Sequence, residues 1–171
     1  MTVGDRLRQV TLVCGPPCGG KSTYVAEHAA PGDLVVCVDT LAQAEGSLVE
    51  HNHTGSHYGR AEKRFLALCA EVRATAEVTA WVVRCAPEPH MRRDLTRQVG
   101  ATKSIVLLPN IQVAAARALE RDPDSYQATW AAIRSWYARF RPGPFDEVRL
   151  VEADGSWRAL EKTHAGVRQR R

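Results

Sequence analysis

The sequence predicts an α/β fold in three layers, with a five-stranded parallel sheet between helices. Short apolar runs, such as residues 10–14 and 34–38, contain almost no polar side chains, which is typical of strands covered on both faces. These runs alternate with longer segments whose apolar residues recur every three or four positions, the period of an amphipathic helix. Alternating strands and helices predict parallel strands joined by right-handed crossovers.

The first half of the chain supports this order. A buried strand is expected over residues 10–14, followed by a glycine-rich loop at 15–20 and a helix at 21–30 that ends at Pro31-Gly32. A second strand, 34–38, leads into Asp39. Residues 45–60 are polar and rich in turn-forming residues, so most of them are expected to form a loop. A helix is predicted at 61–76, where apolar side chains share one face.

The second half repeats the pattern. We expect strands at 78–83, 104–108 and 145–151, and helices at 90–99, 111–120 and 125–140. Trp136 and Phe140 lie four positions apart in the last helix and are expected to pack inward with Trp130 and Tyr137, rather than form a base-stacking platform. Residues 1–171 are expected to form one domain, with a core of about 8–152 and a frayed tail at about 161–171.

Composition limits the class of protein. The 171 residues are 44% hydrophobic and 25% charged, as in ordinary soluble globular proteins. No apolar run approaches the ~20 residues that span a bilayer, so no membrane contact is expected. The five cysteines form no C-x-x-C pair, which favours free thiols in a reducing, cytoplasmic compartment. A net charge of +4 leaves open both a nucleic-acid partner and a solvated basic face.

One motif carries the chemistry. Residues 15–22 read Gly-Pro-Pro-Cys-Gly-Gly-Lys-Ser and match G-x-x-x-x-G-K-[ST] at every fixed position, between a strand and a helix as this phosphate-binding loop requires. The motif predicts that the loop binds ATP or GTP through backbone N–H groups, with Lys21 on the terminal phosphates, Ser22 on Mg²⁺ and Thr23 near the α-phosphate. The nucleotide-binding set is Gly15, Pro16, Pro17, Cys18, Gly19, Gly20, Lys21, Ser22 and Thr23.

Cys18 within this loop and Asp39 near it each have two candidate roles. Cys18 precedes a helix N-terminus, a position that can lower a thiol pKa and permit oxidative shut-off, although a small tolerated side chain is the simpler interpretation. Asp39 follows the second strand, at the sheet edge where ligands bind in open α/β folds. Its carboxylate can accept a proton from an attacking hydroxyl or hold Mg²⁺ through water, and the alternative role is a helix N-cap.

The loop, the strand ending in Asp39 and the arginine-bearing helices resemble the adenylate-kinase-like branch of P-loop kinases. The resemblance covers about residues 10–151 and is greatest to the kinase domains of polynucleotide kinases and to small bacterial and phage ATP-binding proteins of that type. It implies that Asp39 is the base that activates an acceptor hydroxyl. It also implies that Arg117 and Arg121, one helical turn apart, neutralise the transferring phosphate, unless they are solvated surface charges.

The sequence departs from this pattern at the third strand. An acid often follows that strand in these kinases, but here the following residues are Arg84 and Cys85. Mg²⁺ would then depend on Ser22, the phosphates, water and Asp39. Arg84 either faces a phosphate of the acceptor or forms a structural ion pair.

The histidines His51, His53 and His57 suggest a metal site less strongly than a loop that contacts the acceptor. The predicted function is transfer of the γ-phosphate of ATP to a hydroxyl acceptor: a nucleoside, a nucleic-acid 5′ end or another small molecule. Catalysis is assigned to Lys21, Asp39, Arg117 and Arg121, and the metal site to Ser22 and Asp39. The alternatives are an NTPase acting as a nucleotide-dependent switch without a small acceptor, and a binding module without catalysis. The sequence does not determine the oligomeric state.

Overall fold

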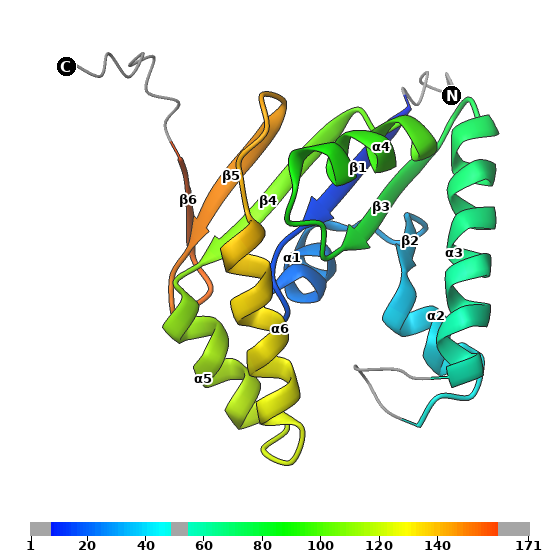
Figure 1. Ribbon diagram of the computed structural model, residues 1–171. Coiled ribbons are helices and arrows are strands. Elements are labelled where there is room, and N and C mark those ends of the chain that lie inside the picture. Colours follow the sequence, from blue (N-terminus) through cyan, green and yellow to red (C-terminus); the bar gives the residue numbers. More distant parts are fainter. Residues whose placement is uncertain (1–7, 49–54, 161–171) are drawn as a thin grey trace.

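The computed structural model describes residues 8–48 and 55–160, whose helices surround one sheet (Figure 1). The expected tail at 161–171 and the histidines His51 and His53 lie outside the described residues. The six strands of the sheet have the order β2-β3-β1-β4-β5-β6. They are β1 (Gln9–Cys14), β2 (Leu34–Cys37), β3 (Thr79–Arg84), β4 (Lys103–Pro109), β5 (Asp146–Val151) and β6 (Trp157–Ala159).

Five parallel strands confirm the predicted sheet, and β1 lies at its centre, paired with β3 on one side and β4 on the other. The sixth strand was not predicted. It pairs antiparallel with β5 through a short turn, so the sheet continues past residue 152, where the core was expected to end. The turn contains Asp154-Gly155, and Gly155 adopts a φ of 91°, as in hairpin loops with a left-handed glycine.

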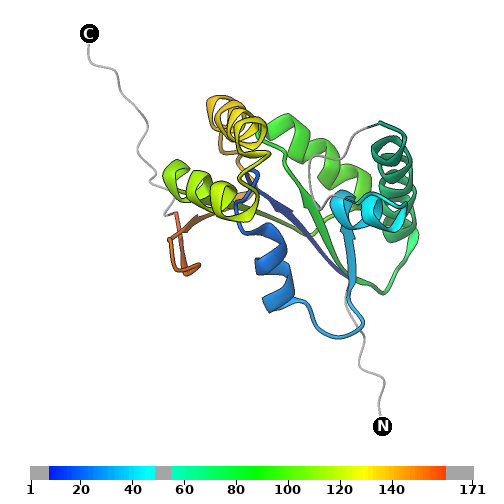
Figure 2. The same cartoon turned by 90° about the horizontal axis from the view of Figure 1, so that it is seen from below.

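The helices form layers on both faces of the sheet (Figure 2). On one face, α1 (Lys21–His28) contributes Tyr24 and Val25 to a cluster with Val13, Ile105 and other strand residues. Strand residues that point the opposite way pack against α2 (Val38–Ala44), α3 (Gly55–Ala74), α4 (Pro89–Val99) and α6 (Tyr126–Arg139). Because alternate residues of the central strands enter different clusters, both faces are buried, as the apolar runs predicted.

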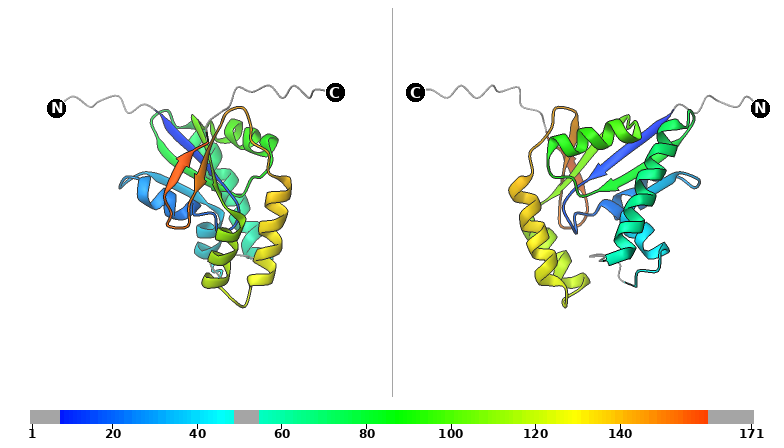
Figure 3. Two further views of the ribbon diagram at one scale, coloured as in Figure 1. Left: turned by 90° about the vertical axis from the view of Figure 1, so that its left-hand side faces the viewer. Right: turned by 45° about the vertical axis from the view of Figure 1, so that its right-hand side comes forward.

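The last two helices extend from the end of the sheet to which the parallel strands point (Figure 3). They are α5 (Ile111–Arg121) and α6, which pack on each other through Ala114, Ala118 and Ile133. Cys18 of the glycine-rich loop packs against the same cluster. At the other end of α6, Trp136 is buried and stacks on Phe140 at 4.8 Å between ring centroids, which confirms that these residues pack inward.

Helix boundaries differ from expectation mainly after β2. The predicted second strand ran to residue 38, but α2 begins at Val38, directly after Cys37. The predicted loop at 45–60 is also shorter than expected, since α3 begins at Gly55 rather than residue 61. Elsewhere the predicted and observed bounds agree within about two residues. In the part of the chain that the structure describes, no helix is long and apolar enough to cross a bilayer.

Candidate nucleotide-binding site

The glycine-rich loop curls between β1 and α1, as its motif predicts. The backbone N–H of Gly19 donates to the carbonyl oxygen of Pro16 at 3.1 Å, which closes a tight turn. Cys18 and Gly20 have left-handed φ angles of 57° and 85°, and Gly20 is the N-cap of α1. The loop therefore leads directly into a helix N-terminus, where unpaired N–H groups and the helix dipole favour an anion.

Two glycines of the loop are required by close packing. A Cβ placed on Gly15 would lie 2.7 Å from the carbonyl oxygen of Leu107. One placed on Gly19 would lie 2.8 Å from the carbonyl oxygen of Pro16. Both neighbours are backbone atoms, so neither clash is relieved by turning a side chain. The sequence of the loop thus fixes how closely it approaches β4 and itself.

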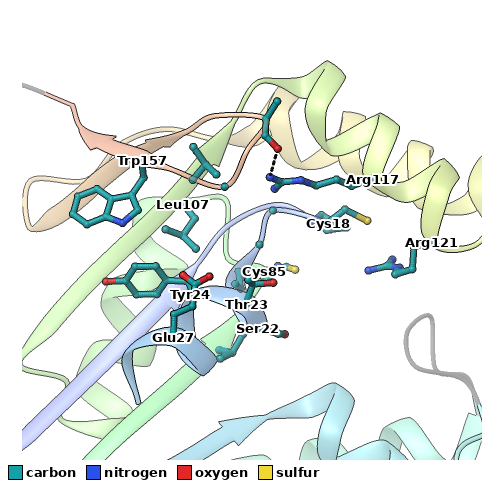
Figure 4. A pocket seen from close by; sticks show the side chains of 18 of the residues that line it. Cys18, Ser22, Thr23, Tyr24, Glu27, Cys85, Leu107, Arg117, Arg121 and Trp157 are labelled. Carbon is teal, nitrogen blue, oxygen red and sulfur yellow. Dashed lines mark hydrogen bonds between the residues drawn. The ribbon is translucent and has the colours of Figure 1, made fainter. Parts of the chain in front are cut away.

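The polar residues of the motif line a cavity of about 980 Å³ (Figure 4). Ser22 and Thr23 are exposed on the first turn of α1. The ammonium of Lys21 donates to the carbonyl oxygen of Pro16 at 2.7 Å, which holds the side chain across the loop. The predicted nucleotide-binding residues from Pro17 to Thr23 all line this cavity, while Gly15 and Pro16 are buried and outside its lining.

Asp39 also lines the cavity, although its local structure differs from prediction. It was expected at the end of a strand, with a helix N-cap as the alternative. Instead it lies in the first turn of α2, whose N-cap is Cys37, so neither description is correct. Val38, the last residue of the apolar run, already has helical backbone. The half-buried carboxylate is still placed at the carboxyl edge of the sheet.

The predicted pair of arginines on α5 reaches the same cavity. Arg117 donates to the carbonyl oxygens of Glu152 and Ala153, at 3.3 and 3.4 Å, and lies 3.5 Å from the position of a Cβ on Gly20. It thus spans the loop and the β5–β6 turn. Arg121 is exposed in the last turn of α5. The structure therefore gathers Lys21, Asp39 and both arginines around one space, while their catalytic roles stay predictions.

The end of the third strand has a structural role. Arg84 donates to both carboxylate oxygens of Glu62, at 3.0 and 2.8 Å, and its guanidinium lies 4.6 Å from the centre of the Phe65 ring. Burial lowers the pKa of Arg84, but the hydrogen bond and the charge of Glu62 raise it above its ordinary value. Of the two interpretations, the structure shows the ion pair.

The surroundings of Cys18 and His57 do not support a redox switch at Cys18 or a metal site at His57. Burial raises the pKa of the Cys18 thiol, despite the opposing effect of Arg121 and Lys21. A raised pKa does not support oxidative shut-off and agrees with the simpler interpretation of a small tolerated side chain. His57 lies in the first turn of α3, where its Nδ1 contacts the carbonyl oxygen of Glu45 at 2.9 Å. The described residues contain no cluster of three metal-binding side chains.

The sequence interpretation missed one wall of the cavity. Tyr24 and Glu27 of α1, Leu107 of β4 and Trp157 of β6 line it near the sheet edge formed by β5 and β6 (Figure 4). The available signal was Asp154-Gly155 between two short runs, a common hairpin turn. It was overlooked because the following strand is only three residues long.

Comparisons with known proteins identify the fold. No protein-family model matches the chain, and no curated protein does. A gluconokinase from Sinorhizobium meliloti 1021 is 18% identical, with a TM-score of 0.55 over 85% of this chain and 83% of that one. A chain of the Pnkp1/Rnl/Hen1 RNA repair complex is 13% identical, with a TM-score of 0.57 over 81% of this chain and 48% of that one. The AvrRxo1-ORF1:-ORF2 complex, solved with ATP, is 14% identical, with a TM-score of 0.55 over 90% and 57%.

At these identities the likeness concerns the fold. It agrees with the strand order, in which β1 and its loop occupy the centre of the parallel sheet, and with the helix that follows the loop. The chain therefore has the α/β fold of the P-loop kinases.

Proposed function

We propose that the protein transfers the γ-phosphoryl group of ATP to a hydroxyl group of an acceptor. One observation carries the proposal: Lys21, Asp39, Arg117 and Arg121, which come from three separate elements, line one cavity with the phosphate-binding loop. A nucleotide site alone needs only the loop. A carboxylate and two further cations around the same space also supply a proton acceptor and charge neutralisation, which phosphoryl transfer requires.

In this proposal, the loop from Gly15 to Gly20 holds the β-phosphate with backbone N–H groups at the start of α1. Lys21 leaves the carbonyl oxygen of Pro16 and pairs with the β- and γ-phosphates. Arg117 and Arg121 approach from α5, so positive charge surrounds the group that moves. Positioning and charge neutralisation account for most of the rate enhancement in this class of reaction.

The residues present also fit a magnesium ion. The Ser22 hydroxyl and the Asp39 carboxylate both line the cavity, where Ser22 would ligate Mg²⁺ directly and Asp39 would hold it through water, with phosphates and water as the other oxygen ligands. Bound there, the ion's contribution is to neutralise charge on the triphosphate. The end of β3 adds no carboxylate to this set, because the residues there are Arg84 and Cys85. Arg84 itself is paired with Glu62.

The transfer step follows from the position of Asp39. The acceptor oxygen attacks the γ-phosphorus as its proton passes to the Asp39 carboxylate, while the bond from the γ-phosphorus to the β–γ bridging oxygen breaks and ADP leaves. Lys21 and Arg121 stabilise the charge on the oxygens of the moving group. Atoms and charge balance without any further reactant.

The structural neighbours support a kinase but differ in what they act on. One is named a gluconokinase, one belongs to an RNA repair complex, and one was solved with ATP. The acceptor panel for this protein should therefore include sugars and sugar acids, nucleosides, and oligonucleotides with a free 5′-hydroxyl. Incubation with ATP labelled at the γ-phosphate and Mg²⁺ should place label on one class of acceptor. Release of free phosphate at a rate that no acceptor changes, without labelling of any acceptor, would instead support the NTPase alternative.

A matched pair of substitutions tests the role of Asp39. Asp39→Asn should reduce transfer by about 10²- to 10⁴-fold, the usual contribution of a positioned acid or base, and leave ATP affinity within a few-fold of the unsubstituted protein. Asp94→Asn is the control, because Asp94 is an exposed aspartate on α4 outside the cavity lining. Normal transfer by Asp39→Asn would exclude Asp39 as the base.

A further inference from the structure

The cavity has two chemically different ends. The loop that follows β1 lies in its middle, because β1 is central in the sheet. Asp39 follows β2 at one edge of the sheet, whereas Trp157 belongs to β6 at the opposite edge. Figure 4 shows Arg121 and Trp157 on opposite sides of the residues that begin α1. A triphosphate held by the loop therefore extends toward a charged end and an aromatic end.

The proposed reaction fixes the direction of the nucleotide. The γ-phosphate must face Asp39, where the acceptor is activated, so the nucleoside extends along α1 toward β6. Tyr24 and Glu27 of α1 line this path, beyond Thr23. Leu107 lines it next to the loop, since it lies beside Gly15, and Trp157 of β6 lies at its far end. The Trp157 ring therefore lies where the nucleobase of a nucleotide bound in this direction would be.

The Trp157 ring is held by a buried cation. The guanidinium of Arg149 lies 3.7 Å from the centre of the Trp157 ring and 5.1 Å from that of Tyr24. Arg149 is 5% exposed, donates to Glu147 through Nε at 2.7 Å, and also donates to the Tyr24 hydroxyl. Contacts to a fixed guanidinium restrict the indole, although Trp157 itself is 40% exposed. A ring positioned in this way loses little side-chain entropy when a ligand stacks on it.

We infer that Trp157 is the stacking surface for the nucleobase, and that Arg149 acts through it as a positioning residue. The inference rests on the proposed function only for the direction of the triphosphate. It adds to that function a specificity element on the β5–β6 hairpin, in which an aromatic face binds the base and the loop binds the phosphates. Stacking accepts any base with a flat ring, so this surface favours nucleotides over bare polyphosphates.

Calorimetric titration with two probes, ATP and inorganic tripolyphosphate, tests the assignment. Trp157→Ala should weaken ATP binding by about 5- to 150-fold, the range found when an aromatic partner of a base is removed, and leave tripolyphosphate binding unchanged. Trp157→Phe retains an aromatic face and should bind ATP within about threefold of the unsubstituted protein. Phe145→Ala is the matched control, since Phe145 is 86% exposed and lies outside the cavity lining, and it should change neither affinity.

Fluorescence provides an independent readout. The other tryptophans, Trp81, Trp130 and Trp136, are outside the cavity lining, so quenching on addition of ATP should come from Trp157. Trp157→Phe should therefore lose the quenching while it keeps most of the affinity. A purely structural role of Trp157 would not produce this separation.

Three results overturn the inference. They are unchanged ATP affinity in Trp157→Ala, an equal loss of ATP and tripolyphosphate binding in that variant, and failure of the unsubstituted protein to bind either probe. The proposed function fails in a different way. If ATP binding depends on Trp157 as expected but no acceptor is ever labelled, the assignment of Trp157 to the nucleobase is kept and the proposed kinase activity is rejected.

Discussion

Removing one partner of the buried ion pair between Arg92 and Asp146 should destabilise the fold without altering the candidate site. The two side chains are 1% and 6% exposed. Asp146 accepts hydrogen bonds from Arg92 Nε and Nη2, at 2.9 and 2.7 Å, and also from the Ser104 hydroxyl and the Gly143 N–H, at 2.8 and 2.7 Å. Every carboxylate oxygen is thus engaged, and none of these residues lines the cavity.

The expected magnitude follows from what each substitution leaves behind. Asp146→Leu leaves a buried guanidinium without its counter-charge, and Arg92→Met leaves a buried carboxylate. Arg92 also donates to the carbonyl oxygens of Ala86 and Pro87, at 2.7 Å each, and these lose a donor in Arg92→Met. Each single substitution should lower the free energy of unfolding by about 3–5 kcal/mol, a large part of the ~5–15 kcal/mol typical of a domain.

The double substitution distinguishes a coupled pair from two separate contacts. When both charges are removed, no isolated buried charge remains, so the double variant should lose about 1–3 kcal/mol less than the sum of the two single losses. Urea unfolding at pH 7, followed by circular dichroism, gives all four free energies. ATP affinity of the folded variants should not change. Additive losses, or single losses below about 1 kcal/mol, would refute the argument that the network is a coupled unit of the fold.

Two further predictions concern the loop and the response to acid. Gly15→Ala should abolish ATP binding in calorimetry, because the new Cβ would clash with the Leu107 carbonyl oxygen. Gly59→Ala is the control and should leave binding intact, because a Cβ there meets no atom within 4 Å. Detectable ATP binding by Gly15→Ala would disprove the packing argument. Burial raises the pKa of Asp146, but the hydrogen bonds from Arg92 and Ser104 and the charge of Arg92 together lower it below its ordinary value. Its folded pKa lies below its unfolded value of about 4, so its stabilisation is complete above about pH 5 and is lost progressively as the pH falls through the unfolded and then the folded pKa. Urea unfolding between pH 6 and 2 should show this loss, and the loss should be smaller in Asp146→Leu; equal acid sensitivity would contradict it.

The sequence predicted the central features of this fold because they depend on local rules. The phosphate-binding loop needs glycines at fixed positions, and the structure explains two of them by contacts with backbone atoms. The five parallel strands were evident as apolar runs because both of their faces are covered. Arg117 and Arg121 reach the cavity together because residues four apart share a helix face.

Features that depend on tertiary contacts were harder to predict from the sequence. An arginine after an apolar strand does not reveal its partner, and the ion pair of Arg84 depends on Glu62, which is 22 residues away. The start of α2 at Val38 was obscured because an apolar residue suits both a strand and a helix. β6 was missed because its three exposed residues have no periodicity of their own. Its importance arises from Arg149, which lies on the neighbouring strand and contacts Trp157.

The contact between Lys21 and Pro16 has a consequence for molecular discrimination. The ammonium of Lys21 already has an oxygen partner in the loop, so a ligand gains only the difference between that partner and its own oxygen. A neutral carbonyl or hydroxyl of a metabolite offers almost no such difference. A doubly charged phosphate offers a larger one, because its full negative charge attracts the ammonium more strongly than the partial charge of a carbonyl oxygen does. In the proposed function, Lys21 would therefore exchange the Pro16 carbonyl for a phosphate group but not for the oxygen of an uncharged molecule.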